Sequence, residues 1–335
     1  MSFTTFGEIM LRLVPAGQED NIQTANLMAV NYAGSESNVA TSLACLGNKV
    51  QFVSKLPLNA LGKAAIQSLN KHGVSTHSVQ LGGDRIGTYF IQLGASIRPS
   101  RVIYDRAGSA IADIGLGEFD WEHILKNQKW LHLSGITPAL STACAKETIL
   151  AAKTARTMGV KVSFDLNYRR SLWPNADKAR KSFDQIIEYT DLLFGNVGVL
   201  KDVYRFEIQE KKGVEQTVNT LQKVRELFGV EQVAFTVRKH NSATHNEISG
   251  ASISDKEPVF SPSYSIQITD RFGTGDAFAA GFLHALGKGW DAKKTIDFAT
   301  AAFALKHTMM GDIHISNEQE INSIAEGNTS GHVIR

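Results

Sequence analysis

The most informative stretch of the sequence is DRFGTGDAF at residues 270–278. A strand-like run precedes it at 264–268, and small and apolar residues at helical spacing follow it at 277–286. Gly273 and Gly275 are therefore expected to form the turn that opens a helix, because glycine lets the backbone approach a bound anion closely. The first amides of a helix have no partner within it, and together with the helix dipole they favour phosphate. The stretch predicts a strand, an anion-binding turn and a helix, in that order.

Asp276 falls in the first turn of the expected helix. A carboxylate at this position either stabilises the helix dipole or acts as a base beside a phosphoryl acceptor. A glycine turn followed by aspartate arises by chance in roughly one chain of this size in ten. Taken alone, the stretch leaves both interpretations of Asp276 open.

Strand and helix patterns alternate along most of the remaining chain. Strands are expected at 50–56, 129–133, 160–165, 192–194 and 233–237. Helices are expected at 61–72, 142–158, 176–189, 214–228, 275–286, 292–308 and 317–325. Strands separated by helices of this length predict βαβ units and a mostly parallel sheet.

Two segments interrupt this alternation. One strand is expected at 6–13, and two more at 88–93 and 102–104 are joined by a loop rich in Gly, Ser and Pro at 94–101. The second pair predicts a hairpin. We expect these strands to form a small sheet outside the main layer, with a mobile flap over a cleft as its role. The alternative is a plain hairpin at the edge of the main sheet.

Composition and charge exclude several classes of protein. The 335 residues are 43% hydrophobic and 20% charged, which is typical of a globular chain, and the formal charge is only +2. A charge this small argues against nucleic acid as a partner. Cys45 and Cys144 are too few for a disulfide framework or a four-ligand zinc site. Neither a basic leader nor a run of eighteen apolar residues occurs, so we expect a cytoplasmic protein with no membrane partner.

Several common catalytic motifs are missing from the sequence. No G-x-G-x-x-G follows a first strand, and the chain has no G-x-x-x-x-G-K-[ST], H-E-x-x-H or G-x-S-x-G. Their absence weakens the dehydrogenase, P-loop NTPase, metalloprotease and α/β-hydrolase interpretations.

A second stretch, near the start of the chain, makes the interpretation of residues 270–278 more specific. It reads AGSESNVA at 33–40 and is followed by Leu-Gly at 46–47. Together with DRFGTGDAF at 270–278, it resembles the two signatures of the PfkB carbohydrate kinases, also called the ribokinase family. The resemblance runs from Phe6 to about Asp312, and the two signatures together are far more specific than either alone.

The resemblance implies a fold and a domain organisation. We expect a ribokinase-like α/β fold of three α/β/α layers, with a mostly parallel central sheet and a small β-sheet lid. A single kinase domain would span residues 1–335, with the lid sheet formed from about 8–32 and 85–108. The lid sheet is also the surface through which we expect copies of the chain to form a homo-oligomer.

Five shorter stretches resemble 2-keto-3-deoxygluconate kinases within that family. They are FGE at 6–8, GDRIGTYF at 83–90, VIYDR at 102–106, LSGITPAL at 133–140 and FDLNYR at 164–169. This resemblance implies ATP-dependent phosphorylation of a keto-deoxy sugar acid to its 6-phosphate. The alternatives are a kinase of fructose, ribose or a nucleoside in the same family, and a non-catalytic relative that binds a sugar acid.

The same resemblance implies a sugar site rich in Arg and Tyr. Its candidates are Gly34, Asn38, Tyr89, Tyr104, Arg106, Ile136 and Arg169. Arg106 and Arg169 suit the carboxylate of a sugar acid, and the tyrosines offer an apolar face with a phenol donor. The competing interpretations are a surface pair of Arg106 with Asp105 or Asp84 and a structural pair of Arg169 with Asp165. Tyr168 and Arg170 flank Arg169 and remain alternatives for its role.

The resemblance also assigns roles to the late stretch. Asp276 would accept the hydroxyl proton, and the amides of Gly273, Thr274 and Gly275 would hold the phosphoryl oxygens. Mg²⁺ would bridge the phosphates of ATP, mostly through water. Closure of the lid would exclude water from the reaction.

The part of the expected site that would bind the nucleotide matches the family's pattern less closely. Its candidates are Asn196, Thr236, Arg238, Gly273, Gly275 and Thr300. The family's N-x-x-E element reads NVGV at 196–199 and lacks the Glu, which puts the water-mediated Mg²⁺ arrangement in doubt. Arg238 or Lys239 faces the nucleotide phosphates, or both lie in a solvated loop. Asp270 and Asp312 fall where related kinases bind a monovalent cation such as K⁺, and we keep that site as one alternative.

Overall fold

The central sheet of the protein is mostly parallel, as the alternation of strands and helices predicts. The computed structural model describes residues 1–16, 21–207, 213–254 and 257–331. Seven strands run parallel in the order β11-β10-β9-β8-β1-β4-β5, and β12, β13 and β14 extend the sheet in antiparallel fashion beyond β11. Their bounds are β1 Ser2–Phe6, β4 Lys49–Leu56, β5 Val79–Leu81, β8 Trp130–Ser134, β9 Lys161–Asp165, β10 Leu192–Gly195, β11 Gln232–His240, β12 His245–Ile253, β13 Val259–Phe260 and β14 Tyr264–Gln267.

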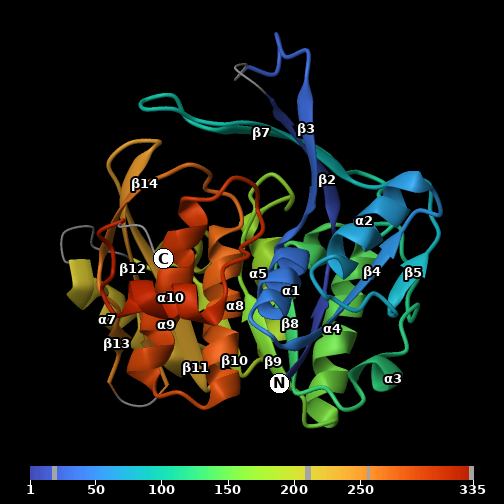
Figure 1. Ribbon diagram of the computed structural model, residues 1–335. Helices are drawn as coiled ribbons and strands as arrows, with labels where there is room; N and C mark the ends of the chain where they lie inside the picture. Colours follow the sequence, from blue (N-terminus) through green and yellow to red (C-terminus); the bar gives the residue numbers. More distant parts are fainter. Residues whose placement is uncertain (17–20, 208–212, 255–256, 332–335) are drawn as a thin grey trace.

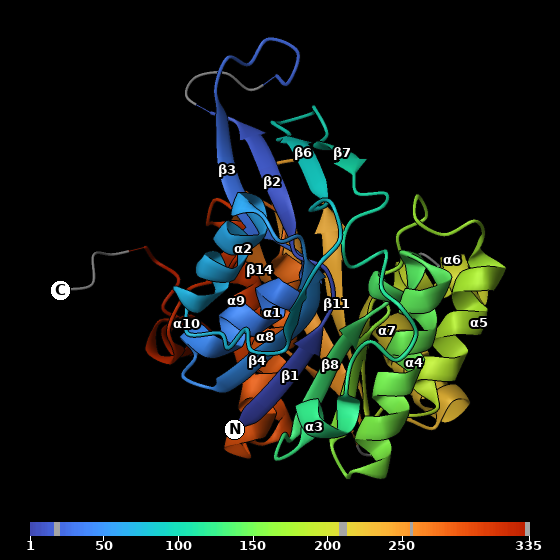
Figure 2. The same ribbon diagram turned by 90° about the vertical axis from the view of Figure 1, so that its right-hand side faces the viewer.

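Helices cover both faces of this sheet, which gives three layers (Figure 2). One face carries α3 Trp121–Leu125, α4 Thr142–Thr157, α5 Ala176–Ile187, α6 Val197–Tyr204 and α7 Gly213–Phe228, with the short η1 Thr137–Ala139 before α4. The other carries α1 Ser35–Cys45, α2 Ala60–Asn70, α8 Thr274–Lys288, α9 Ala292–His307 and α10 Glu318–Ala325. No helix in the described ranges has both the length and the hydropathy needed to span a bilayer.

Each helical layer packs its own apolar core against the sheet. Phe183 and Leu221 belong to the core under α4–α7, and Phe282 and Phe303 belong to the core under α8 and α9. Strands between two such cores have both faces buried, so they read as continuous apolar runs. In β8, WLHLS, every residue is buried.

A separate small sheet stands beyond the carboxyl ends of the parallel strands (Figure 1). Its order is β3-β2-β6-β7, and its strands are β2 Met10–Pro15, β3 Met28–Ala33, β6 Thr88–Gln92 and β7 Arg101–Asp105. The hairpin of β6 and β7 therefore belongs to this sheet and not to an edge of the main one.

The single strand expected at 6–13 is in fact two strands in two sheets. Phe6 ends β1 in the main sheet, and Met10 begins β2 in the small one. Gly7 lies at the crossing, where an added Cβ would meet the carboxyl carbon of Glu36 at 2.1 Å. The apolar pattern continues across the crossing because both strands are buried, so periodicity alone does not reveal the break.

Candidate active site

A cleft of about 680 Å³ opens at the carboxyl ends of β9, β10 and β11, next to the start of α8. The carboxyl edge of parallel strands is where ligands of open α/β sheets bind. Its lining includes residues from DRFGTGDAF, from the FDLNYR stretch and from the segment after β10. These residues are Asp165, Asn167, Tyr168, Arg169, Phe194, Gly195, Asn196, Val197, Gly198, Val199, Thr217, Thr236, Val237, Arg238, His240, Arg271, Phe272, Gly273, Thr274, Gly275, Asp276, Phe278 and Phe303.

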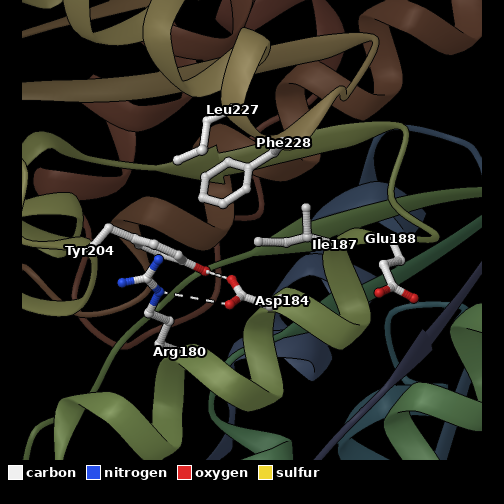
Figure 3. Close-up of a pocket in the computed structure, with 7 residues that line it drawn as sticks. All are labelled: Arg180, Asp184, Ile187, Glu188, Tyr204, Leu227 and Phe228. Atoms are coloured by element: carbon white, nitrogen blue, oxygen red, sulfur yellow. Dashed lines mark hydrogen bonds and ion pairs between the residues drawn. The ribbon is translucent and has the colours of Figure 1, made fainter.

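A second hollow, of about 280 Å³, lies between α5, α6 and α7 (Figure 3). Three of the polar side chains that line it, Arg180, Asp184 and Tyr204, contact one another. Tyr204 donates its hydroxyl to Oδ1 of Asp184 at 3.1 Å, and Arg180 Nε lies 3.7 Å from Oδ2 of the same carboxylate. Because these three side chains already contact one another, they are less available to a ligand, and we place the candidate site in the larger cleft.

The glycine turn before α8 has the predicted form. Gly273 has φ +71°, and an added Cβ would meet the backbone oxygen of Asp312 at 1.7 Å. Only glycine fits there. The first hydrogen bond of the helix runs from Ala277 N to Gly273 O at 3.0 Å, so the amides of 274–276 precede the helical ladder. These amides can therefore donate hydrogen bonds to an anion in the cleft.

Asp276 lies at this turn with both carboxylate oxygens hydrogen-bonded. Ser35 Oγ donates to Oδ1 at 2.7 Å, and Asn38 Nδ2 donates to Oδ2 at 2.7 Å. Burial raises the pKa of Asp276 to about 7, against the two hydrogen bonds, which lower it. The nearby charges of Asp165 and Asp312 add to the increase. A carboxyl group that titrates near neutral pH suits a general base.

The early stretch at 33–40 supplies those two donors because it folds against the late one. Gly34 is the N-cap of α1, and an added Cβ there would meet the backbone oxygen of Glu8 at 1.9 Å. Ser35 and Asn38 follow in the first turns of the helix. Asn167 Nδ2 donates to Ser35 Oγ at 3.0 Å, which extends the hydrogen-bonded chain to β9. Neither Ser35 nor Asn167 is among the site residues predicted from the sequence, although both lie inside the stretches at 33–40 and 164–169.

Arg106 follows β7 and is buried, and its partner is neither of the carboxylates named in the competing interpretation. Its guanidinium forms an ion pair with Glu8, and its Cζ lies 5.5 Å from the ring centre of Tyr104. Asp105 pairs instead with Arg85, at 2.8 Å. The competing interpretation, a surface pair of Arg106 with Asp105 or Asp84, is therefore contradicted, because Arg106 is buried whereas Asp105 is exposed.

The other sugar candidates are spread between the cleft wall and the small sheet. Arg169 lines the cleft with Tyr168, whereas Arg170 turns away to an exposed pair with Asp202 at 3.3 Å. Tyr89 of β6 is buried, and its hydroxyl donates to Asp312 Oδ2 at 2.8 Å.

Tyr104 is more exposed and lies against Tyr89, with ring centres 6.0 Å apart. Ile136 precedes η1 away from the cleft lining, with its amide donating to Ser134 Oγ at 3.2 Å.

Five of the six nucleotide candidates line the cleft, and Thr300 does not. The five are Asn196, Thr236, Arg238, Gly273 and Gly275. Thr300 is fully buried in α9, and its hydroxyl donates to Ile296 O at 2.8 Å. An added Cβ at Gly250 would lie 2.3 Å from that hydroxyl, so Thr300 packs against β12 and does not reach a ligand.

The few protein donor atoms at the cleft suit a metal ion that is held mainly by a bound substrate. Asn196 caps α6 by accepting a hydrogen bond from Val199 N at 3.1 Å, and an apolar residue occupies position 199. Asp165 and Asp276 are the carboxylates that line the cleft in the described part of the chain. Within those same ranges, no three His, Cys, Asp or Glu side chains gather at one point. Mg²⁺ commonly binds through one or two carboxylates together with substrate phosphates, and this donor set fits that arrangement.

Asp270 and Asp312, the candidates for a monovalent cation, are already bridged by a protein cation. Arg12 of β2 places Nη2 2.5 Å from Asp270 Oδ2 and Nε 2.9 Å from Asp312 Oδ1. Lys306 is buried nearby and donates to Met309 O at 3.0 Å. The donor set therefore favours a protein-made ion cluster over a K⁺ site.

Comparisons with known proteins identify the family of this chain. The model of the pfkB family of carbohydrate kinases matches residues 2–319. A 2-dehydro-3-deoxygalactonokinase of Haloferax volcanii is 32% identical over 327 residues, which are 98% of this chain and 97% of the relative.

Two crystal structures share the fold throughout. That of 2-dehydro-3-deoxygluconokinase from Thermotoga maritima is 41% identical, covers 98% of both chains and has a TM-score of 0.95. That of a PfkB family carbohydrate kinase from Listeria grayi is 31% identical, covers 97% of this chain and 100% of its own, and has a TM-score of 0.90. With the cleft, the glycine turn and both signature stretches in place, this chain belongs to the PfkB family of carbohydrate kinases.

Proposed function

We propose that this carbohydrate kinase transfers the γ-phosphoryl group of ATP to the 6-hydroxyl of 2-keto-3-deoxygluconate. The observation that carries the proposal is the position of Asp276, a buried carboxyl with a pKa raised to about 7 at the start of α8. The name of the T. maritima relative supports the choice of acceptor.

In the proposed reaction, Asp276 accepts the proton of the attacking hydroxyl. The amides of Gly273, Thr274 and Gly275 donate to the oxygens of the transferred phosphoryl group, where negative charge is spread in the transition state. Mg²⁺ bound with ATP supplies further positive charge to the phosphates. The protein contributes position and electrostatics, because phosphoryl transfer needs little else.

Arg169 is the leading candidate for binding the carboxylate of the sugar acid. It lines the cleft together with Asp165, whose pKa is raised by burial and lowered in part by the Asn167 amide and by the charge of Arg169. Arg106 already shares its charge with Glu8, so it brings less net charge to a substrate. The sugar would lie between the cleft wall and the tyrosines of the small sheet.

The small sheet is proposed as a lid and as a contact between copies of the chain. Phe272 lines the cleft and packs against the inner residues of this sheet, such as Met10 and Ile91. Its outer face exposes Val30 by 57% and Ile103 by 56%. Apolar groups exposed together on one sheet favour association.

A second candidate acceptor is 2-keto-3-deoxygalactonate. The H. volcanii relative carries the name of a kinase for that epimer. Both acceptors are keto-deoxy acids with a terminal hydroxyl, so Asp276 and Arg169 would have the same roles.

The test is ADP release from Mg-ATP with 2-keto-3-deoxygluconate, its galactonate epimer and fructose offered in parallel. Faster turnover with the gluconate epimer, and a phosphate at C6 by NMR, are expected. Faster turnover with the galactonate epimer would replace the acceptor and keep the chemistry. Turnover with fructose alone would overturn the acidic sugar site, and no turnover with any of the three would favour a binding protein.

A further inference from the structure

Two arginines line the cleft, and neither forms an ion pair with a carboxylate in the part of the chain that the structure describes. Arg238 comes from β11, and Arg271 comes from the turn before α8. Burial and, to a smaller extent, the positive charge of Arg271 together lower the pKa of Arg238 to about 10. Burial also lowers the pKa of Arg271. Two like charges near each other and partly buried are unfavourable unless an anion binds between them.

Apart from Arg271, the groups that contact Arg238 are neutral. Its Nη2 donates to Thr274 Oγ1 at 3.3 Å and lies 2.9 Å from Nε2 of His307. Burial lowers the pKa of His307 to about 3, so this ring is an uncharged acceptor. The guanidinium carbon also lies 5.4 Å from the ring centre of Phe303. These contacts orient the guanidinium without neutralising it.

Arg271 has fewer partners still. With the amide of Asn246 turned so that its oxygen faces the arginine, Nη2 donates to Oδ1 at 3.2 Å. Its Nε is buried and finds no acceptor within the described ranges. Across those ranges no ion pair includes the partly buried Arg238 or Arg271, whereas the buried Arg12 and Arg106 each contact a carboxylate.

The position of the pair identifies the class of ligand. Thr274 bonds Arg238 and also belongs to the glycine turn that offers amides to an anion, so the two cations continue the same anion-binding surface. A ligand that satisfies both must carry several negative charges along its length, since one end meets the turn and the rest meets the guanidinium groups. A chain of phosphates has that form, and guanidinium forks match phosphate oxygens.

We propose that Arg238 and Arg271 form a fixed dication that binds the polyphosphate chain of the nucleotide directly, so that the site accepts a polyphosphate even without a divalent metal. This inference rests on the proposed kinase function for the identity of the ligand. It adds that the protein itself supplies positive charge at the phosphates next to the one transferred. The scarcity of carboxylates at the cleft fits this arrangement, because a metal would find few protein ligands there.

The test is isothermal titration calorimetry of the full chain with inorganic tripolyphosphate in EDTA, without sugar. The wild type should bind tripolyphosphate, and ADP should compete. Arg271→Gln and Arg238→Gln should each weaken binding by about tenfold or more, the effect of losing one charge-assisted contact. Arg271→Lys, which keeps the charge, should recover part of the loss.

Lys239→Gln is the matched control. Lys239 is the next residue along β11, but it points outward and pairs with Glu247 at 3.2 Å. Its variant should bind tripolyphosphate as the wild type does. Wild-type affinity in both Arg271→Gln and Arg238→Gln, or no binding by the wild type in EDTA, would overturn the inference. Arg271 is the less buried of the two, so its variant remains informative if Arg238→Gln does not fold.

The titration separates this inference from the proposed function. Turnover of a keto-deoxy acid together with tripolyphosphate binding that ignores both arginines would keep the function and discard the dication. Arginine-dependent binding without turnover of any tested sugar would keep the dication and discard the proposed acceptor.

Discussion

Asn38 and Asp276 are 238 residues apart in the chain, and the side-chain amide of Asn38 donates to Oδ2 of Asp276 at 2.7 Å. Ser35 holds the other oxygen at 2.7 Å. Both donors lie at the start of α1, and Asp276 lies in the first turn of α8. The two signature stretches are therefore one structural unit, which fixes the direction of a single carboxylate.

Replacing Asp276 by asparagine removes the proposed base with little change in size. We expect kcat to fall about a hundredfold or more, the usual size of a general-base effect, while ATP and sugar still bind. Initial rates of ADP release and calorimetric titration measure the two quantities separately. Turnover close to the wild-type value would remove Asp276 from this role.

The fall of kcat/KM at low pH should report the protonation of Asp276. Burial raises its pKa to about 7, and the base acts as the carboxylate, so kcat/KM should rise with pH through this range and then level off. The hydrogen bonds from Asn38 and Ser35 lower the pKa. Ser35→Ala should therefore move the rising limb to higher pH, and a limb that moves to lower pH would contradict the assignment.

Arg12 should be required for stability. Arg12→Met would leave Asp270 and Asp312 buried beside each other without their shared cation, and breaking a buried pair from one side costs about 3–5 kcal/mol. Urea unfolding at neutral pH measures the loss. Arg85→Gln breaks an exposed pair with Asp105 and serves as the control, with little change expected. Equal stability of the two variants would show that Arg12 is dispensable.

The two glycines of the turn should differ in their tolerance of alanine. Gly273→Ala would force a Cβ to within 1.7 Å of Asp312 O at a positive φ, so a clear fall in Tm is expected. An added Cβ at Gly275 meets nothing within 4 Å, so Gly275→Ala should fold normally. Its methyl group would enter the cleft and reduce turnover. Thermal unfolding and rate measurements on both proteins check this contrast, which a similar Tm for both would refute.

Arg169 and its neighbour Arg170 form a matched pair for testing the sugar site. Arg169→Gln should raise KM for a keto-deoxy acid by about tenfold or more, as expected for a lost charged contact. Arg170→Gln should leave KM unchanged, because that side chain pairs with Asp202 outside the cleft. A larger effect at position 170 would reverse the assignment.

Local patterns in the sequence were sufficient for the main architecture. The glycines of residues 270–278, with a strand before them and a helix after them, predicted the turn, and Asp276 lies where the pattern placed it. Alternating strands and helices likewise predicted the parallel sheet. Such features depend on neighbours within a few residues, and these are visible in one sequence.

Contacts between distant segments were harder to predict. The partner of Arg106 is Glu8, and the partners of Arg12 are Asp270 and Asp312. Each pairing depends on how the small sheet meets the main one, and no local pattern encodes that. The family resemblance offered a cation site at Asp270 and Asp312 as one alternative, and the fold places Arg12 between these two carboxylates.

The small sheet is held at its base, and the turn between β6 and β7 is also joined to the main sheet by a hydrogen bond from Ala243 N to Ser96 O at 2.8 Å. Arg12 and Tyr89, on its two central strands, are buried against the cluster of Asp270 and Asp312, whereas Leu27 and Val30 near its far end are exposed. The β2–β3 side is mechanically a cantilever, whose deflection grows with distance from the fixed end. Closure over a sugar would then be a bending of β3 and the outer part of β2, while the glycine turn proposed to bind phosphate keeps its position.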